Sequence, residues 1–438
     1  MKKFLKQLSP PRIIAFGFLA VILLGSILLI LPFSLKDGVR LSYVDALYTS
    51  TSAVCVTGLT VVDTGNAFSP WGQFILGLLI QIGGLGVTSV GAGIIIAMGK
   101  KINARGRNLI VEASNLGTRG GTIKFLKSVF FTTITIELIG AIFSFLVFVR
   151  VYPPLKALGY SLFHSVAAFN NSGFDNLGLS GEVYNGVSLI PYQNNLLFNL
   201  VTCALIFLGG IGFLVIKEVI YKRFKWKKLS MHARVVLSMS LVLTVVGTLL
   251  LKLTEDISWQ GAFFSSVSAR TAGFSSFPLS KFSTAGLLVM IVLMFIGASP
   301  GSTGGGIKTS TFFALLQGIK SAATNKSEKA FNYSMPEGSF RKAAVITLIG
   351  LGVVTSGTYL MVIMDPELRF IDALFEIVSA FGTVGLSTGI TTSLSVGSKI
   401  LSMFIMFIGR LGPLTIATLW YFNKGERVEY PEGNIAIG

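Results

Sequence analysis

Residues 372–386 read DALFEIVSAFGTVGL, and segments of the same design occur three more times in the chain. Aligned on the last glycine, the others are DALYTSTSAVCVTGL at 45–59, YSLFHSVAAFNNSGF at 160–174 and QGAFFSSVSARTAGF at 260–274. Each has an aromatic residue ten positions before that glycine, a small residue five before it, and Leu or Phe directly after it. Four matches in phase indicate an internal repeat, and this repeat decides the fold.

Long apolar stretches flank each of these segments. At about 20 residues per crossing, we expect eight membrane spans, near 12–32, 69–98, 128–149, 194–216, 235–253, 281–319, 342–364 and 397–421. The second is longer than one crossing and is expected to be a tilted or extended helix, and the sixth is interrupted. The first follows basic residues but lacks a small-residue cleavage site, so we expect a retained helix rather than a signal peptide.

The composition agrees with a membrane protein. Of 438 residues, 52% are hydrophobic and 13% are charged, about half of the ~25% charged residues of soluble domains. Two Cys and two His argue against a disulfide scaffold or a dedicated zinc site. No nucleophile–base pair is visible, so we expect a protein that is not an enzyme and has no catalytic residues.

The net charge of +17 comes from 36 Lys and Arg against 19 Asp and Glu. The basic residues concentrate at both ends of the chain and between alternate spans, which is the positive-inside pattern. We therefore expect a multi-pass protein of the plasma membrane with both termini in the cytoplasm. The basic loops lack the aromatic interleaving of a nucleic-acid surface, so anionic lipids and an acidic cytoplasmic partner are the expected contacts. Candidate partner-facing residues are Arg105, Arg107, Lys227 and Lys228.

The spans that follow the four segments repeat as well. Gln81–Gly86, Phe207–Gly212, Phe295–Ala298 and Phe407–Gly412 share one frame built around a glycine. The repeating unit is therefore helix, short re-entrant helix, loop, helix. The expected organisation is repeat 1 at 1–99, a basic loop at 100–127, repeat 2 at 128–216, a basic loop at 217–234, repeat 3 at 235–320, a loop at 321–341, repeat 4 at 342–421 and a tail at 422–438.

A helix of about ten residues cannot cross a bilayer, so each short helix must enter and return. Irregular backbone at membrane depth persists only where protein covers it or where it lines water. Four returns around one axis would give a pore ringed by carbonyls and by the partly negative C-terminal ends of four helices. We therefore expect an all-α fold of eight spans and four re-entrant pore helices in pseudo-fourfold arrangement. The simpler alternative, a turn after a buried helix, does not explain four glycines in phase.

This fourfold pattern resembles the Trk/Ktr/HKT superfamily of potassium transporters, and most of all the membrane subunits of bacterial Ktr systems. The resemblance covers essentially the whole chain. It implies K⁺ uptake, often stimulated by Na⁺, with K⁺ bound at filter backbone carbonyls. The filter residues that it implies are Val56, Thr57, Gly58, Asn171, Ser172, Gly173, Thr271, Ala272, Gly273, Thr383, Val384 and Gly385.

The resemblance also implies partners. A homodimer is expected, with a cytoplasmic ring of RCK-domain regulatory subunits of the KtrA/KtrC type. A nucleotide, ATP/ADP or NAD-like, would bind only to that partner, and no covalent cofactor is expected.

Only the fourth filter, Thr383-Val384-Gly385, keeps the first three residues of the T-V-G-Y-G filter of tetrameric channels. Less strict discrimination between K⁺ and Na⁺ is therefore expected. Family members with serine in place of the first glycine favour Na⁺, whereas Gly58 is intact here. The alternatives are a stoichiometric Na⁺/K⁺ symporter and a less selective Na⁺/K⁺ conductor. Symporters usually show inverted repeats and midplane ionisable residues, whereas these repeats run parallel.

The sixth span is broken by a segment too rich in glycine and proline to stay helical. It would lie beneath the filter, and in the family it corresponds to an intramembrane gate. A phosphate-binding loop is the alternative, but Ile307 interrupts the motif and no strand is expected before it. The expected gate residues are Gly297, Ala298, Ser299, Pro300, Gly301, Ser302, Thr303, Gly304, Gly305 and Gly306.

Two arginines lie at membrane depth. Arg410 occupies the position of Gly84 and Gly210 in other repeats, where an unpaired arginine costs at least ~2.5 kcal/mol. We expect it to line the pore, contact the glycine-rich segment and act as part of the gate, with snorkelling to an interface as the alternative. Arg270 is expected to support the filter by pairing with Glu376 or Asp372.

Three further polar residues are less informative. Glu137 serves either helix packing or an ion site, and the sequence leaves both open. His164 and His232 are expected to be structural.

Overall fold

The computed structural model describes residues 9–99, 102, 104–113, 120–177 and 188–418, and it is almost entirely helical. Four helices are long and apolar enough to cross a membrane by themselves, and they match the first span expected for each repeat. Ser230 caps α12 by accepting a hydrogen bond from the Ala233 N–H, and Pro10 and Pro11 begin α2, as favours a helix start. The four are α2 (Pro10–Ile30), α8 (Thr122–Phe148), α12 (Met231–Thr254) and α16 (Ser339–Met364).

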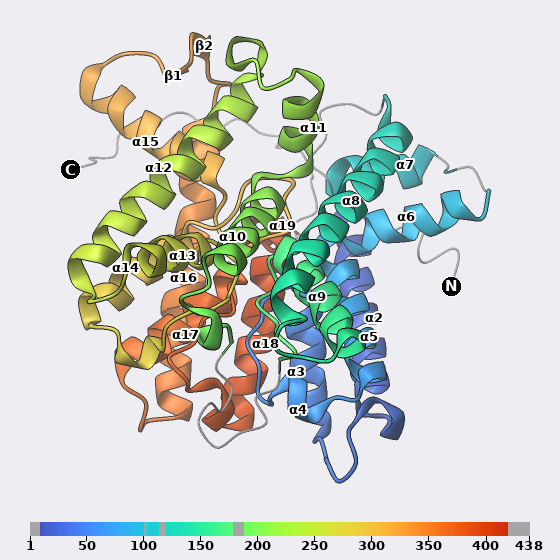
Figure 1. Cartoon of the computed structure of the whole chain (residues 1–438). Helices are drawn as coiled ribbons and strands as arrows, with labels where there is room; N and C mark the ends of the chain where they lie inside the picture. Colours follow the sequence, from blue (N-terminus) through green and yellow to red (C-terminus); the bar gives the residue numbers. More distant parts are fainter. Residues whose placement is uncertain (1–8, 100–101, 103, 114–119, 178–187, 419–438) are drawn as a thin grey trace.

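Each long helix packs against a short one that follows it in the chain. The short helices have 11 to 16 residues, which at 1.5 Å per residue is less than one bilayer crossing. They occupy the interior between the longer helices (Figure 1). The short re-entrant helices are α3 (Tyr43–Val54), α9 (Pro154–Phe169), α13 (Trp259–Ala269) and α17 (Phe370–Gly382).

The second span is bent in two repeats and is interrupted by a glycine in a third. α5 (Pro70–Leu85) and α6 (Val87–Ala97) meet at 101° around Gly86, and α10 (Leu196–Ile211) and α11 (Phe213–Tyr221) meet at 100°. In the fourth repeat, Gly412 separates α18 (Val396–Leu411) from α19 (Pro413–Thr418). The expectation of a tilted or extended second span is therefore wrong. The apolar stretch 69–98 is longer than one crossing because it includes α6, which runs in a different direction from α5.

The third repeat is interrupted, as its sequence predicts. α14 (Thr284–Phe295) is followed by irregular backbone over residues 296–308, and α15 (Thr309–Thr324) resumes the helix. A single parallel bridge joins Ile296 to Ile307. By length and composition the described helices provide up to six crossings. The layout with eight spans remains a prediction, because α14 and α18 are each shorter than a full crossing.

The remaining elements are short and lie at the two ends of the bundle. α7 (Ala104–Ala113), α11, α15 and the hairpin of β1 (Lys329–Ala330) and β2 (Tyr333–Ser334) gather at one end, and α4 (Thr64–Ala67) lies at the other (Figure 1). Single 3₁₀ turns occur at Pro32–Ser34, Ile190–Tyr192, Trp226–Lys228, Leu279–Lys281 and Thr391–Ser393.

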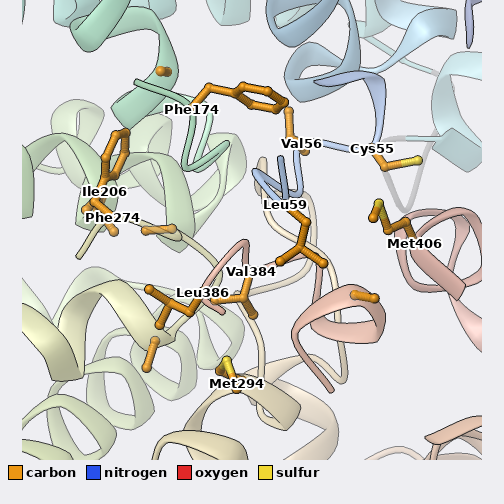
Figure 2. Packing of buried hydrophobic residues seen from close by; sticks show 14 of the residues in the cluster. Cys55, Val56, Leu59, Phe174, Ile206, Phe274, Met294, Val384, Leu386 and Met406 are labelled. Atoms are coloured by element: carbon orange, nitrogen blue, oxygen red, sulfur yellow. The ribbon is translucent and has the colours of Figure 1, made fainter. Parts of the chain in front are cut away.

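The core surrounds the ends of the re-entrant helices. Side chains directly after the four repeat glycines, Leu59, Phe174, Phe274 and Leu386, are all buried there (Figure 2). The outer faces of the long helices instead expose large apolar side chains such as Leu24, Phe131 and Leu348. An apolar belt of this kind fits a surface in contact with lipid.

Candidate functional site

The four repeat glycines meet in a ring in chain order. A Cβ on Gly58 would lie 2.9 Å from the Gly173 Cα, and one on Gly173 would lie 3.0 Å from the Gly273 Cα. A Cβ on Gly273 would collide with the Val384 carbonyl oxygen, and one on Gly385 would lie 2.9 Å from the Gly58 Cα. The ring therefore closes, and only glycine permits the backbone of four segments to approach so closely. We call residues 56–58, 171–173, 271–273 and 383–385 the four filter segments.

Each filter segment has the same unusual backbone. The glycines have φ of 93°, 69°, 82° and 96°, as their sequence position predicts. The residue two positions earlier is also left-handed, with φ of 51° at Val56, 54° at Asn171, 71° at Thr271 and 49° at Thr383. A β-branched residue there is strained by roughly 1–3 kcal/mol. The sequence does not reveal this left-handed conformation, because of the four residues only Asn171 is of a type that adopts it readily.

The backbone N–H groups of the filter segments donate back into their own re-entrant helices. Thr57 N donates to Ser52 O at 2.7 Å and Gly58 N donates to Ser52 Oγ at 3.0 Å. In the fourth repeat Ser379 accepts the equivalent bonds from Val384 N at 2.9 Å and Gly385 N at 3.0 Å. Because the donors are satisfied from behind, the carbonyls remain available on the axial side.

In repeats 2 and 3 the hydrogen bonds between the filter segment and its re-entrant helix differ from those in repeats 1 and 4. In repeat 3, Gly273 N donates to Ser268 O at 3.3 Å, and the Ser268 hydroxyl donates to Phe274 O. In repeat 2 the corresponding residue is Ala167, whose carbonyl accepts from Ser172 N and Ser172 Oγ. The second filter segment therefore lacks the serine support of the others.

Two threonine side chains of the filter segments have unsatisfied hydroxyl groups. Thr57 Oγ1 and Thr383 Oγ1 are buried and have no hydrogen-bond partner within the described residues. A buried hydroxyl without a partner is costly, and its oxygen is a suitable ligand for a dehydrated K⁺. The two threonines are not at equivalent positions, because Thr57 directly precedes Gly58 whereas Thr383 lies two residues before Gly385.

The irregular segment 296–308, which we call the loop, lies directly against the filter. A Cβ on Gly304 would lie 2.9 Å from Thr271 Cβ, and one on Gly305 would lie 2.7 Å from Thr383 Cγ2. The loop therefore contacts two of the filter segments, and its role as a gate stays a prediction. The two glycines are needed because a side chain at either position would enter a filter segment.

The loop is held by neighbouring backbone. Ser299 N donates to Gly210 O at 3.0 Å, and Phe213 N donates to Gly301 O at 3.1 Å. Lys308 Nζ donates to Gly304 O at 2.7 Å and to Gly305 O at 3.1 Å. In the sequence, Lys308 is one of the basic residues expected in the cytoplasm, and it also follows Ile307 near the lysine position of the phosphate-binding motif. The helix α14 precedes this segment, and the lysine is used inside it, so that alternative has no structural support.

Arg410 joins the loop to the first repeat. From α18 its guanidinium donates to the carbonyls of Thr303 and Gly83, and to Gly84 O at 3.2 Å. The expected contact with the glycine-rich segment is confirmed, and the side chain does not take the snorkelling alternative. A cavity of about 560 Å³ lies beside it and is also lined by Ser302, Gly304 and Lys308. Three basic residues, Lys308, Lys342 and Arg410, therefore line this cavity.

The expected pairing of Arg270 with an acidic residue of α17 is wrong. Arg270 caps the end of α13 and turns to its own repeat, donating to Ser240 O at 2.8 Å and Ser240 Oγ at 3.1 Å. Glu376 instead accepts from Ser387 Oγ at 2.7 Å and Thr391 Oγ1 at 2.6 Å, which fixes the chain after the fourth filter segment. Local hydroxyls satisfy Glu376, so it does not need a distant guanidinium.

Asp372 also has a local partner. Arg369 Nε donates to it at 2.7 Å, and this carboxylate raises the pKa of Arg369 above its ordinary value.

The mouth on the α4 side of the filter carries acidic groups. Asp63 caps α4 by accepting from the Gly65 and Asn66 N–H groups. Asp175 follows the second filter segment, and burial together with the neighbouring Asp63 raises its pKa to about 6. Asp45 on α3 pairs with Lys399 at 2.8 Å and so joins repeat 1 to repeat 4.

The remaining expected residues lie away from the filter. His164 Nε2 lies 3.0 Å from Thr202 Oγ1 in the packed core, as expected for a structural histidine. Lys227 and Lys228 lie on a 3₁₀ turn at the end of the bundle that also holds α11. Arg107 lies on α7, and the side chain of Arg105 falls outside the described residues.

Comparison with known proteins agrees with this architecture. The model of the TrkH family, described as cation transport protein, matches residues 13–255 and 229–426. Ktr system potassium uptake protein B of Bacillus subtilis is 36% identical over 99% of this chain and 97% of its own length. Potassium/sodium uptake protein NtpJ of Enterococcus hirae is 36% identical over 100% and 99%.

A solved structure shares the fold. The potassium transporter TrkH of Vibrio parahaemolyticus matches with a TM-score of 0.70 at 19% identity, covering 93% of this chain and 86% of that one. With the closed ring of four filter segments and full-length relatives above 30% identity, the chain belongs to the TrkH family of cation transport proteins.

Proposed function

We propose that this chain is the ion-translocating membrane subunit of a potassium uptake system, and that K⁺ passes through the ring of four filter segments. The observation that carries this proposal is the closed glycine ring with backbone N–H groups turned away from the axis. Carbonyl rings of this kind replace the hydration shell of K⁺. Relatives that match over their full length are named as potassium uptake proteins.

Permeation is proposed to be channel-like, with K⁺ favoured over Na⁺. The twelve residues of the filter segments are uncharged, and the repeats run in parallel rather than inverted, which argues against a stoichiometric symporter. A less selective Na⁺/K⁺ conductor is the second candidate, because one relative is named a potassium/sodium uptake protein. Intact Gly58 favours the first candidate. Stimulation by Na⁺ is part of the proposal.

The loop is proposed to be the gate. It contacts two filter segments, and Arg410 and Lys308 donate to its carbonyls. In this position it closes the axial path, and the two cations beside it repel K⁺. Opening requires the loop to leave Thr271 and Thr383, which would break the bond from Arg410 to Thr303 O.

A cytoplasmic ring of nucleotide-binding RCK subunits is the proposed regulator, and the membrane subunit is proposed to be a homodimer. Two relatives are named as proteins of a Ktr system, which fits a membrane subunit with a separate partner. The basic end of the bundle, with α7, α11, α15 and the hairpin, is the proposed cytoplasmic face for that partner and for anionic lipids. The proposal includes a location in the plasma membrane with both termini in the cytoplasm, which the positive-inside pattern of the sequence supports.

The test is Rb⁺ uptake by cells that lack their own K⁺ uptake systems, with this chain alone and with an RCK partner. We expect uptake that K⁺ competes for and that the partner increases. Absence of uptake in both arms, with the chain present in the membrane, would overturn the function. Equal uptake of Na⁺ and Rb⁺ would favour the less selective conductor.

A further inference from the structure

A buried polar cluster connects the second filter segment to two membrane helices. It consists of Glu137 on α8, Gln81 on α5 and Asn170 at the end of α9, and we call it the Glu137 cluster. Asn170 is fully buried and Glu137 is only 9% exposed. Because Asn170 directly precedes Asn171, a change in the cluster acts on the backbone of the filter segment.

The cluster has more hydrogen-bond acceptors around Asn170 Nδ2 than this nitrogen has hydrogens to donate. Asn170 Nδ2 lies 2.8 Å from Gln81 Oε1, 2.9 Å from Val166 O and 3.0 Å from Glu137 Oε1. An amide nitrogen carries two hydrogens, so one of these three oxygens receives none from it. A protonated Glu137 would add one donor to this donor-poor cluster, since a carboxylic acid carries an O–H group.

The charge of the cluster also favours a protonated, neutral Glu137. The Glu137 carboxyl group meets the neutral amides of Gln81, with Nε2 at 3.3 Å, and Asn170. The three ion pairs found among the described residues use other carboxylates. A carboxylate at membrane depth is costly without a cation, and a bound proton removes that cost.

The charged groups on neighbouring elements are separated from Glu137. Arg410 reaches α5 at the Gly83 and Gly84 carbonyls, next to the turn that holds Gln81. His164 on α9 turns to Thr202 of α10. Lys127 lies ten residues from Glu137 on α8 itself, about 15 Å along the helix, and α10 carries no charged side chain. Arg107 on α7 lies near the cytoplasmic end of α8.

The second repeat is set apart from the others at this position. The hydroxyls of Ser50, Ser165 and Ser266 donate to the carbonyls of Ile22, Glu137 and Thr244, so these three residues occupy equivalent places. Glu137 alone is acidic among them. It also belongs to the repeat in which Ala167 replaces the supporting serine.

We propose that Glu137 is a positioning residue for the second filter segment, held as a neutral acid, and that loss of its proton releases Asn170 and weakens discrimination between K⁺ and Na⁺. This inference rests on the proposed function. A polar contact that replaces a missing serine explains why a carboxyl group is kept inside an apolar bundle.

The experiment measures Rb⁺ and Na⁺ flux into vesicles that contain the purified full-length chain, from about pH 6 to about pH 9, where a buried carboxyl group titrates. The wild type is compared with Glu137→Gln, Glu137→Ala and the matched control Thr244→Val at the equivalent place in repeat 3. We expect the Rb⁺ to Na⁺ flux ratio of the wild type to fall about fivefold with rising pH, the effect of one buried hydrogen bond. Glu137→Gln should keep the high ratio throughout, and Glu137→Ala should show the low ratio throughout.

The inference is overturned if Glu137→Gln follows the wild-type pH curve, if it falls to the level of Glu137→Ala, or if the wild-type ratio does not change with pH. It is also overturned if Thr244→Val loses discrimination as Glu137→Ala does, because the effect would then be general packing. If Glu137→Ala fails to fold, the pH profile of Glu137→Gln decides alone. A wild-type chain that carries neither ion contradicts the proposed function and this inference together, whereas unchanged variants of a conducting wild type contradict this inference only.

Discussion

The helices α5, α10, α14 and α18 all end in the same sequence frame around a glycine. In the third repeat, after α14, this frame has a different structure from that in the other three repeats. Gly83, Gly209 and Gly409 lie inside helices and pack against the final turns of the re-entrant helices. A Cβ at any of them would collide with the carbonyl of Val54, Phe169 or Phe381. Gly297, at the same place in the third repeat, packs instead against Gly305 of its own loop.

This difference supports the proposed gate, because one repeat has an irregular loop where the other three have helices. In repeats 1, 2 and 4, the glycine brings two helices together, and each helix then bends or ends at Gly86, Gly212 or Gly412. In repeat 3, helix α14 stops at Phe295, and the loop occupies the space beside the re-entrant helix. Glycine at the same place therefore joins two helices in three repeats and packs against the proposed gate in the remaining repeat.

The largest effect is expected from Gly209→Ala. The new Cβ would meet the Phe169 carbonyl, which is backbone and cannot move aside without shifting α9, so we expect a destabilisation of about 3 kcal/mol. The measurement is the thermal unfolding midpoint of the purified protein. Gly91→Ala on α6 is the control, since no atom lies within 4 Å of its Cβ position. A midpoint equal to that of Gly91→Ala would show that the packing of α10 on α9 is loose.

Gly297→Ala tests the same position in the third repeat. Its Cβ would collide with the Gly305 carbonyl, and we expect the loop to be displaced rather than the fold to be lost. The predicted result is a Rb⁺ uptake rate at least about tenfold higher, the effect of removing about 1.4 kcal/mol from a barrier. The unfolding midpoint should change less than in Gly209→Ala. A variant that unfolds as readily as Gly209→Ala, without faster uptake, would contradict the distinction between gate and scaffold.

Arg410→Gln tests the contact that holds the loop to the first repeat. The change removes a cation beside the pathway and its hydrogen bonds to Thr303, Gly83 and Gly84. Hydrogen bonds from a charged group are worth about 1.5–3 kcal/mol, so faster Rb⁺ uptake by a factor of up to about ten is expected from partial opening. The backbone bonds of the loop to Gly210 and Phe213 remain, which limits the gain. Uptake at the wild-type rate would remove Arg410 from the gate.

Gly58→Ser separates the filter from the gate. Its Cβ would collide with the Ser172 carbonyl, and φ of 93° is unfavourable for serine. We expect the ratio of Rb⁺ to Na⁺ flux to fall about fivefold, as for the loss of about 1 kcal/mol of discrimination, while the loop stays in place. Competition between the two ions in the uptake assay measures this ratio. A variant with full discrimination would contradict the assignment of Gly58 to the filter.

The sequence predicted the parts of the fold that repeat. Four segments in phase placed Gly58, Gly173, Gly273 and Gly385 at one site, because a pattern that recurs four times cannot reflect one local accident. The glycine- and proline-rich break was equally readable, since such residues cannot continue a helix. Arg410 was found because an arginine at membrane depth requires a partner.

Features that depend on tertiary packing were not readable. The bend at Gly86 is a matter of φ at one glycine, and the sequence offered a longer helix as an equally simple explanation. The predicted partner of Arg270 was wrong because the arginine contacts Ser240 on α12, another helix of the same repeat. The spacing of residues in the sequence does not predict such a contact. The left-handed conformation of Val56 and Thr383 contradicts their residue type, and only the closed ring imposes it.

The smallest effect is expected at the last position of the shared frame. Gly86 has φ of 85°, where other residues are strained, but no atom lies within 4 Å of its Cβ position. Gly86→Ala should therefore cost only backbone strain, about 1 kcal/mol, seen as a slightly lower unfolding midpoint than that of Gly91→Ala. The third repeat already carries Pro300 at this place and has no bent helix. If Gly86→Ala is as stable as Gly91→Ala, the direction of α6 is set by packing against α8 and α2, and the glycine only permits the bend.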